Sequence, residues 1–304
     1  MPIALPPIDR RSFLAGTLAL GGGLLLPRFV AAGHDTRDPN RFMLLADTHV
    51  PGQRDLVHDA IRPAANLEQA VGEIVALHPR PAGAIVAGDC AFRRGEAADY
   101  VTLRDLLEPL RKAGVPVHLA MGNHDDRKHL LAAFPEARPS DTIAQQVPDR
   151  CISILEAPNA NWFVLDSQER PGVTPGNLGQ RQLAWLGKAL DARPDKPALV
   201  VAHHNPDTQE PAQGLKDTKA LLDVLRPRRQ VKGYFFGHTH AWRLGQQAGI
   251  HMVNIPTLVW VFDKAQPRGF VDAHLKPDGV RLVLHALDHR HARQGQTVDL
   301  QWRK

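Results

Sequence analysis

The fold is decided by a short stretch in which an apolar run ends in polar residues, Ala120-Met121-Gly122-Asn123-His124-Asp125. A buried strand is normally closed by a generic turn residue. Here the strand pattern stops at side chains that coordinate metals or move protons, and a glycine at the junction allows a tight backbone turn. The stretch therefore predicts a strand whose carboxyl end carries part of a polar site.

Four more apolar runs along the chain end in the same way. They are Leu45-Ala46 before Asp47, Val86-Ala87-Gly88 before Asp89, Val201-Ala202 before His203, and Phe235-Phe236-Gly237 before His238. In open α/β sheets, functional residues gather at the carboxyl ends of the strands. Five chain segments are therefore expected to converge on one place.

Between these runs the apolar residues follow a helical period. The helical segments are 66–77, 100–110, 180–190 and 218–225. Alternation of strand and helix patterns favours an α/β arrangement. Asn66 is the expected cap of the first helix, residues 135–150 are expected to form an irregular loop, and 151–165 predicts a hairpin that turns at 159–161.

The composition excludes several classes of protein. The 304 residues are 43% hydrophobic and 23% charged, which is typical of a soluble globular protein. A formal net charge of +5 is too mild to indicate nucleic-acid binding, so no nucleic-acid partner is expected. Beyond residue 32 no stretch is long and apolar enough to span a membrane, so no stable membrane anchor is expected.

The first 32 residues have the order of parts found in a twin-arginine (Tat) signal peptide. The pair Arg10-Arg11 precedes an apolar stretch from 14 to 26, and small residues at 30–32 supply a cleavage site after Ala32. The pattern predicts a protein handled by the Tat export machinery and delivered to the periplasm or the extracellular space. A short N-terminal helix or a disordered segment is the alternative.

Two cysteines occur in the chain, Cys90 and Cys151. An even number in an exported protein permits a disulfide. Cys90 follows a candidate metal ligand, which favours a buried free thiol, and two unrelated core cysteines are the preferred interpretation.

The five strand ends together carry the residue types of a metal site. Asp47-x-His49 puts two ligand types two residues apart, and one carboxylate such as Asp89 can bridge two ions. Each motif is weak alone, because a lone buried histidine is more often a satisfied core residue. Two histidine pairs at strand ends, 203–204 and 238–240, argue against that interpretation.

Taken in order, the motifs resemble the calcineurin-like metallophosphoesterase superfamily. Residues 122–127, Asp166-Ser167 and 182–186 look particularly like its class III cyclic-nucleotide phosphodiesterase and glycerophosphodiesterase branch. The resemblance extends from about Arg41 to Leu287. It implies a phosphoesterase domain over residues 33–304, folded as a four-layer α/β/β/α sandwich of two mixed β-sheets flanked by helices, with the metal site at the carboxyl ends of strands.

Carried over residue by residue, the resemblance implies two metal ions that share one aspartate. The ligand sets are Asp47, His49, Asp89 and His240 for the first ion, and Asp89, Asn123, His203 and His238 for the second. His124 would stabilise developing charge or protonate the leaving oxygen, and Asp125 would orient its ring. His204 and Arg127 would lie behind the ligands or face the substrate. The family favours iron or manganese in this branch, with zinc as an alternative.

The expected activity is hydrolysis of a small-molecule phosphodiester by attack of a metal-bridging hydroxide. A phosphomonoesterase or nucleotidase on the same site is the first alternative. The second is a metal-stabilised binding protein that has lost catalysis, although such relatives usually lose a ligand or the histidine beside the asparagine. Cyclic AMP fits the branch, but the signal segment argues against a cytoplasmic substrate and favours scavenging of phosphate from diesters.

Overall fold

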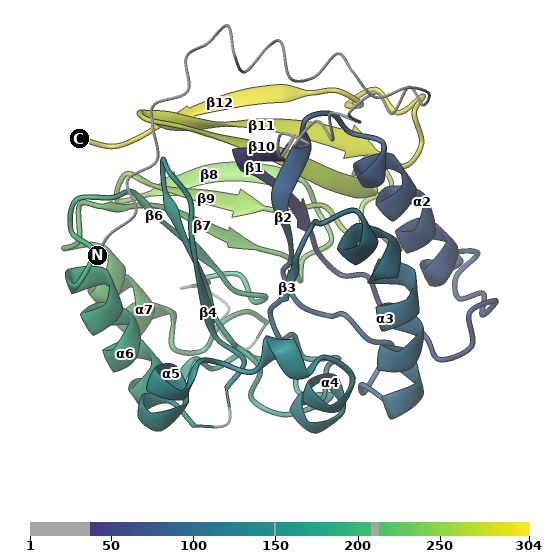
Figure 1. The fold of residues 1–304 in the computed structure, drawn as a ribbon, viewed down its shortest axis with the longest axis horizontal. Coiled ribbons are helices and arrows are strands. Elements are labelled where there is room, and N and C mark those ends of the chain that lie inside the picture. The colour runs from purple at the N-terminus through teal and green to yellow at the C-terminus, as the bar shows by residue number, and fades with distance from the viewer. Residues whose placement is uncertain (1–36, 149, 208–212) are drawn as a thin grey trace, which may run out of the picture. The chain divides into compact units, whose positions relative to one another are not determined.

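Two six-stranded β-sheets lie face to face at the centre of the fold (Figure 1). They belong to a computed structural model that describes residues 37–148, 150–207 and 213–304. The predicted signal peptide, residues 1–32, lies outside the described residues. Within the described ranges, no helix is long and apolar enough to cross a membrane.

The first sheet has the strand order β12-β11-β10-β1-β2-β3. Its strands are β1 (Arg37–Leu45), β2 (Arg80–Val86), β3 (Val117–Leu119), β10 (Gly269–Lys276), β11 (Gly279–Ala286) and β12 (Thr297–Gln301). β1 pairs in parallel with β2, and β2 with β3, whereas β10 runs antiparallel to β1. The carboxyl ends of β1, β2 and β3 therefore meet at one edge of this sheet.

The second sheet has the order β4-β5-β6-β7-β9-β8. Its strands are β4 (Ser153–Glu156), β5 (Asn161–Val164), β6 (Ala198–Val201), β7 (Val231–Phe236), β8 (Arg243–Gln247) and β9 (Ile250–Asn254). The four central strands are parallel, and the edge strands β4 and β8 are antiparallel to their neighbours. Both sheets are therefore mixed.

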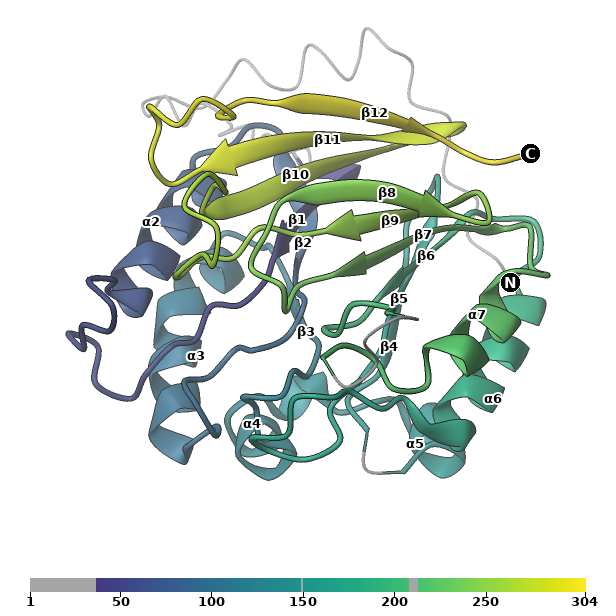
Figure 2. The same ribbon diagram turned by 180° about the vertical axis from the view of Figure 1, so that it is seen from behind.

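Helices cover the outer face of each sheet, as the two opposite views show (Figures 1 and 2). They are α2 (Pro63–Val75), α3 (Ala97–Lys112), α4 (Arg127–Ala133), α5 (Asp141–Gln146), α6 (Gly179–Asp191) and α7 (Thr218–Leu225), with a 3-10 turn η1 (Pro135–Ala137). Helices α2 and α3 share a core with Met43 and Leu45 of β1, whereas α6 and α7 share one with Phe163 and Val200.

A third apolar core fills the space between the sheets. It joins Leu44 and Ile85 of the first sheet to Trp162, Leu199 and Phe235 of the second. Alternate residues of β1 therefore face opposite cores, as the two-residue period of a strand requires. This arrangement confirms the expected four-layer α/β/β/α sandwich.

Two local predictions differ from the structure, and one strand was not predicted. Helix α2 begins at Pro63 and not at Asn66, because proline is favoured in the first helical turn. The side-chain Nδ2 of Asn66 donates instead to Leu258 O at 2.5 Å. Residues 135–150 hold η1 and α5 and are not a plain loop. β12 was not predicted at all, whereas the hairpin of β4 and β5 is confirmed.

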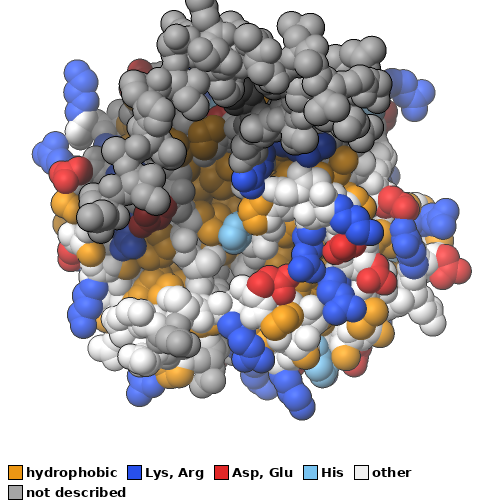
Figure 3. Space-filling model, in the orientation of Figure 1, with side chains coloured by type: hydrophobic (Ala, Val, Ile, Leu, Met, Phe, Trp, Pro, Cys, Tyr) orange, Lys and Arg blue, Asp and Glu red, His pale blue; other side chains and the backbone are white. Residues whose placement is uncertain are grey.

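One face of the molecule is hollowed along its middle (Figure 3). Hydrophobic side chains gather in the hollow, and basic and acidic side chains are interspersed over the helices to its right. A cavity of about 260 Å³ lies between the two edge strands β3 and β4, where Val117, Leu119 and Ile152 contribute apolar walls. The charged surface on this face is mixed in sign.

Candidate metal centre

The five predicted strand ends do converge. Four overlapping groups of histidine and aspartate place their ligand atoms within 4.8 Å of one another. The groups contain Asp47, His49, Asp89, His124, His203, His204, His238 and His240. We call the seven predicted ligands the strand-end cluster: Asp47, His49, Asp89, Asn123, His203, His238 and His240.

Backbone hydrogen bonds hold the strand-end segments against one another. The backbone amides of Asp47 and His49 donate to Gly88 O and Asp89 O at 3.1 and 2.9 Å. The segments that follow β1 and β2 therefore stay side by side beyond the ends of the strands. The amide of Gly237 donates to the carbonyl of His203 at 3.0 Å and joins the ends of β6 and β7 in the same way. The cluster is therefore carried by the sheets themselves.

Five members of the cluster adopt a left-handed backbone that L-residues seldom use. The φ angles are positive at Asp47 (52°), His49 (43°), Asp89 (48°), His238 (68°) and His240 (51°). Such a conformation costs on the order of 1 kcal/mol or more per residue, and it concentrates where function requires it. At these strand ends, the left-handed turn redirects each side chain from the sheet into the cluster.

Two glycines leave room that no other residue would. A Cβ added to Gly122 would overlap Asp89 Oδ1, and one added to Gly88 would come within 2.6 Å of His203 Cβ. Gly88 also has a φ of +84°, which favours glycine. Both positions therefore let carboxylate and imidazole approach the backbone closely.

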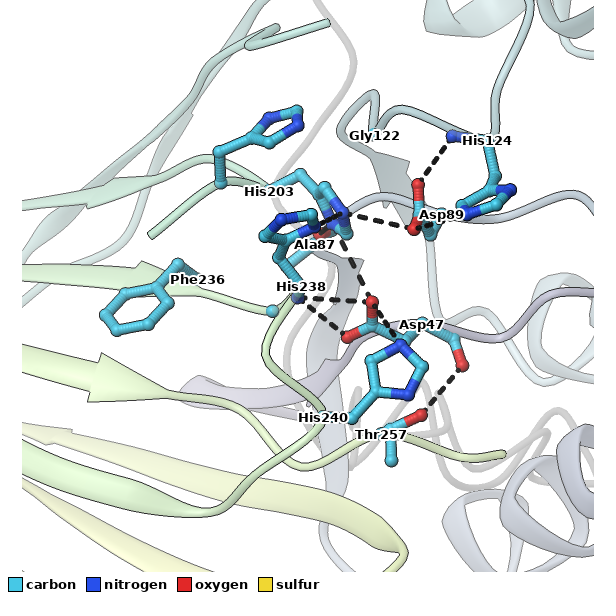
Figure 4. A network of polar contacts seen from close by, with 12 residues as sticks. Asp47, Ala87, Asp89, Gly122, His124, His203, Phe236, His238, His240 and Thr257 are labelled. Carbon is cyan, nitrogen blue, oxygen red and sulfur yellow. Dashed lines mark hydrogen bonds and ion pairs between the residues drawn. The ribbon is translucent and has the colours of Figure 1, made fainter. Parts of the chain in front are cut away.

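The two aspartates of the cluster are buried and have only histidines as ion-pair partners in the described part of the chain. Asp89 Oδ2 lies 3.2 Å from His203 Nε2 and 3.7 Å from His49 Nε2. Asp47 Oδ1 lies 3.4 Å from His240 Nε2. Figure 4 shows the His203 ring between Asp47 and Asp89. Two anions are thus buried together without an arginine or lysine beside them.

The hydrogen bonds of three histidines determine which ring nitrogen faces the cluster. His203 Nδ1 lies 2.9 Å from Ala87 O, and His240 Nδ1 lies 2.7 Å from Trp260 O. A carbonyl oxygen only accepts, so each Nδ1 carries a proton, and in the neutral ring each Nε2 presents a lone pair. His238 is reversed, because its Nε2 donates to Gln213 O at 2.7 Å. Its Nδ1 is therefore the nitrogen that faces His203 and the cluster.

These lone pairs fit a metal ion. His203 Nε2 and His238 Nδ1 face one another at 3.2 Å, and in the neutral tautomers neither carries a proton. At bond lengths near 2.1 Å, two ligands of one ion lie about 3–4 Å apart. The donor separations of the cluster fall in that range, and carbonyl partners behind metal-binding imidazoles are a usual arrangement.

Two further members have buried atoms without a hydrogen-bond partner among the described residues. They are both ring nitrogens of His49 and the side-chain oxygen of Asn123. A buried polar atom left unpaired costs about 1–3 kcal/mol. Unpaired ligand atoms beside two carboxylates are what a site built for cations would contain.

The pKa shifts give the same picture of negative charge that attracts cations. Burial disfavours the charged form of His203, but Asp89 and Asp47 outweigh it and raise its pKa to about 9. Burial also opposes ionisation of Asp89, yet the adjoining histidines hold its pKa well below the usual range. By contrast, burial lowers the pKa of His49 to about 3 and that of His238 to about 4.

The structure corrects the expected role of Asp125. Its carboxylate accepts hydrogen bonds from the amides of Cys90, Ala91 and Gly122 and from the hydroxyl of Tyr100, at 2.9–3.2 Å. It does not hold the His124 ring, whose Nδ1 lies 2.5 Å from the carbonyl of Arg93. Asp125 instead ties the loop after β3 to the loop after β2.

His204 and Arg127 lie behind the cluster. His204 Nδ1 contacts Ser167 Oγ at 2.8 Å, while its buried Nε2 has no hydrogen-bond partner in the described chain. The Arg127 guanidinium donates two hydrogen bonds, of 2.6 and 2.8 Å, to the Asp166 carboxylate. This bidentate pair occupies the fork that would otherwise hold a substrate, so a substrate-binding role for Arg127 is not supported.

Sequence reasoning missed Trp260, whose carbonyl fixes the His240 ring and whose side chain lies 4.7 Å from that of His49. It also missed the carbonyl of Arg93. A backbone carbonyl has no residue-type signature, so no motif could have revealed either contact. Cys90 and Cys151 are both buried and free, as expected, and burial raises the pKa of each thiol.

Curated relatives with similar sequences are phosphodiesterases. The 3′,5′-cyclic adenosine monophosphate phosphodiesterase CpdA of Vibrio vulnificus is 28% identical over 260 residues, which is 83% of this chain and 89% of that protein. A probable cyclic nucleotide phosphodiesterase of Rhodopseudomonas palustris is 33% identical, covering 69% and 75%. The glycerophosphodiester phosphodiesterase GpdQ of Enterobacter lignolyticus is 28% identical, covering 71% and 78%.

A solved structure with a similar fold is a dimetal phosphatase from Danio rerio. It superposes with a TM-score of 0.66 at 19% identity, over 88% of this chain and all of that one. The family model for calcineurin-like phosphoesterases matches residues 40–242, a span that includes every member of the strand-end cluster. This chain therefore belongs to the calcineurin-like phosphoesterase family and is a phosphoesterase hydrolase.

Proposed function

We propose that this chain hydrolyses phosphodiesters at two metal ions held by the strand-end cluster. Asp47, His49, Asp89 and His240 would hold the first ion, and Asp89, Asn123, His203 and His238 would hold the second. The observation that carries the proposal is the pair of lone-pair nitrogens, His203 Nε2 and His238 Nδ1, which face one another at 3.2 Å beside a buried carboxylate. The relatives, which are diesterases, support the choice of diesters.

Bound metals would neutralise the phosphate oxygens, lower the pKa of an attacking water and orient it in line with the leaving alkoxide. The chain's own residues set the geometry. The carbonyls behind His203 and His240 fix both rings, and the amide of His124 donates to Asp89 Oδ1 at 2.8 Å. Asp125 keeps the two loops that carry Asp89 and Asn123 at a fixed separation.

His124 is placed to protonate the leaving oxygen. Its Nδ1 donates to Arg93 O, so Nε2 is the exchangeable nitrogen, and Nε2 lies 4.0 Å from Asp89 Oδ2. One third of the side chain is exposed, so the ring reaches both the cluster and solvent. A protonated Nε2 passes its proton to the departing alkoxide as the bond to phosphorus breaks.

Replacement of His124 by alanine tests that role. We expect metal content to be unchanged and turnover of a diester to fall by about 10²- to 10³-fold, the range of general acid–base catalysis. His129→Ala is the matched control, since its Nδ1 contacts a backbone carbonyl, Gly95 O, at 2.8 Å but lies outside the metal-competent groups. Equal turnover in the two variants would refute the assignment.

The diester preference is tested by rates on bis-(p-nitrophenyl) phosphate and p-nitrophenyl phosphate, measured with the same metal-loaded protein. We expect a higher kcat/KM on the diester. A monoester preference of tenfold or more would instead support the phosphomonoesterase alternative.

Export is a separate part of the proposal and rests on the sequence alone. The twin-arginine pair and the small residues before position 33 support delivery to the periplasm, where a diesterase can release phosphate from external esters. Arg10→Lys with Arg11→Lys should retain the protein in the cytoplasm of a Tat-competent host. An unchanged periplasmic fraction would contradict Tat export.

A further inference from the structure

Four aromatic rings form a chain of contacts that starts at the strand-end cluster, and none of the four belongs to a ligand motif. We call them the aromatic rim: His58, Phe92, Trp260 and Phe262. The Trp260 ring packs 4.7 Å from His49 and 5.7 Å from His240, measured between centroids. The His58 ring packs edge-on against Trp260 at 5.2 Å and against Phe92 at 5.4 Å. The rim thus begins at two predicted metal ligands.

Phe262 is the outermost part of the rim and is unusually exposed. Its ring stacks on that of His240 at 4.7 Å with an interplanar angle of 17°, yet 73% of the residue is open to solvent. A large apolar side chain in that state gains little from folding, and an exposed apolar surface beside polar groups often marks a binding site. One face of the ring is therefore available to a ligand.

A strained turn holds the opposite side of the rim. His58 and Ile61 exchange two backbone hydrogen bonds of 2.9 Å, and the residues between them, Asp59 and Ala60, have φ of 48° and 60°. Two positive φ angles define the tight hairpin turn that normally uses Asn-Gly. A turn that keeps this conformation without glycine stores strain, and here it presents His58 to Trp260.

Two residues of the rim and two of the turn border a cavity of about 700 Å³. Trp260 and Phe262 form part of its wall, as do Asp59 and Ile61 of the turn. The predicted metal ligands do not line it, so the cavity adjoins the cluster and is not the same space. Its volume lies within the range of small-molecule sites. A substrate held at the cluster could extend past Phe262 into it.

The cavity wall favours a neutral, polar and planar occupant. Lys264 and Arg268 contribute positive charge, Asp59 and Asp288 contribute negative charge, and Gln266 contributes an amide. A further anionic group would meet the two acids, and a long acyl chain would bury charges without partners. A glycerol group would leave the Phe262 ring uncovered, whereas an aromatic ring would stack on it.

We propose that Phe262 and this cavity form a subsite for the non-leaving substituent of the diester, and that the subsite selects a nucleoside. The planar base stacks on the free face of Phe262, and the sugar and base edges meet the polar wall of the cavity. This inference rests on the proposed phosphodiesterase function, and it names a specificity-determining residue that contacts substrate without touching the reacting atoms.

The test uses two esters that release the same p-nitrophenolate and differ only in the other substituent, thymidine 5′-(p-nitrophenyl phosphate) and methyl p-nitrophenyl phosphate. The bond that breaks is the same in both. For Phe262→Ala, kcat/KM on the thymidine ester should fall by about tenfold or more, mainly through KM, because stacking of one base is worth about 1–3 kcal/mol. The methyl ester should change by less than about twofold, and Phe262→Trp should restore the thymidine ester.

Val101→Ala is the matched control, since Val101 is 49% exposed and lies on α3, outside the rim and the cavity. Equal losses on both esters for Phe262→Ala would overturn the subsite. If the wild-type protein hydrolysed neither ester, the proposed function would fail. Calorimetric binding of thymidine 5′-phosphate would then decide separately, since a Phe262→Ala affinity equal to that of the wild type would overturn the subsite as well.

Discussion

The sequence pattern Asp-x-His occurs at two places, and the two copies have different surroundings in the structure. Asp47-x-His49 follows the end of β1 with a left-handed backbone at both residues. Asp272-x-His274 lies inside β10, where residues two apart share a face of the sheet. Both aspartates are buried, and both contact histidines. Spacing and burial therefore do not distinguish them.

The source of the opposing charge distinguishes them. Arg41 on β1 grips Asp272 with hydrogen bonds of 2.6–3.1 Å, and His274 and His285 lie 3.0 and 3.9 Å from the same carboxylate. We call these four residues the Arg41 cluster. The chain neutralises Asp272 with its own guanidinium, whereas the ion-pair partners of Asp47 and Asp89 among the described residues are all histidines. Buried carboxylates that are paired only with side chains able to bind metal indicate a site that recruits a metal cation.

The largest expected effect of breaking this contrast is at the strand-end cluster. Asp89→Asn removes the charge that faces both His203 and His49. We expect metal content to fall and diester turnover to drop by at least about 10³-fold, since the metals supply several kcal/mol of transition-state stabilisation. Elemental analysis and initial rates test this. Retention of more than a tenth of the activity would show that Asp89 does not hold the ions.

The corresponding change in the Arg41 cluster should affect stability and not function. Asp272→Asn leaves the buried guanidinium of Arg41 unpaired, which should lower the free energy of unfolding by about 3 kcal/mol. Metal content and kcat should stay at wild-type values at a temperature where the variant is folded. Urea unfolding tests the first claim and elemental analysis the second. A loss of metal in this variant would show that the Arg41 cluster also contributes to metal binding, which contradicts the prediction.

A double variant tests whether the loss of stability comes from the unpaired charge. Arg41→Leu with Asp272→Leu removes both charges. The double variant should therefore lose less unfolding free energy than either Arg41→Leu or Asp272→Leu alone. If the loss in the double variant equalled the sum of the losses in the two single variants, the pair would act through packing and not through charge.

The ligand positions could be predicted because each followed directly from an apolar run at a strand end. The parallel strands β1, β2 and β3 of one sheet and β6 and β7 of the other put those ends at shared edges, so local patterns implied a common site. Asp125 could not be placed in the same way. Its partners are the amides of Cys90, Ala91 and Gly122, and an amide proton is present at nearly every residue.

The aromatic rim lay beyond prediction for a related reason. Trp260 and Phe262 occupy the connection between β9 and β10, where neither strand periodicity nor a motif constrains them. Their meaning comes from ring contacts with His49 and His240, which are more distant along the chain than any local pattern reaches. The ligand cluster is thus encoded locally, whereas the surface expected to choose the substrate is encoded only by the tertiary fold.

The smallest expected effect is a pH dependence confined to the Arg41 cluster. Burial acts to raise the pKa of Asp272, but hydrogen bonds from His274 and Arg41 outweigh it and the net shift is downward. A carboxyl group with a depressed pKa stabilises the fold above its unfolded value, near 3.9, and loses that contribution as the pH falls through the folded value. The gap in unfolding free energy between wild type and Asp272→Asn should therefore persist at neutral pH and shrink below about pH 4.

Urea unfolding of both proteins across this range, in the presence of a chelator, isolates the effect, because the strand-end cluster is then equally metal-free in each and its protonation cancels in the difference. His274 and His285 also face the carboxylate and become positively charged when protonated, so they strengthen its attraction until Asp272 itself takes up a proton. A gap that already narrowed on acidification well above pH 5 could not come from those histidines, whose protonation widens it, and would show that the pKa of Asp272 is not depressed. The carboxylate would then not be the group that Arg41 stabilises, and the contrast between the two Asp-x-His copies would rest on backbone conformation alone.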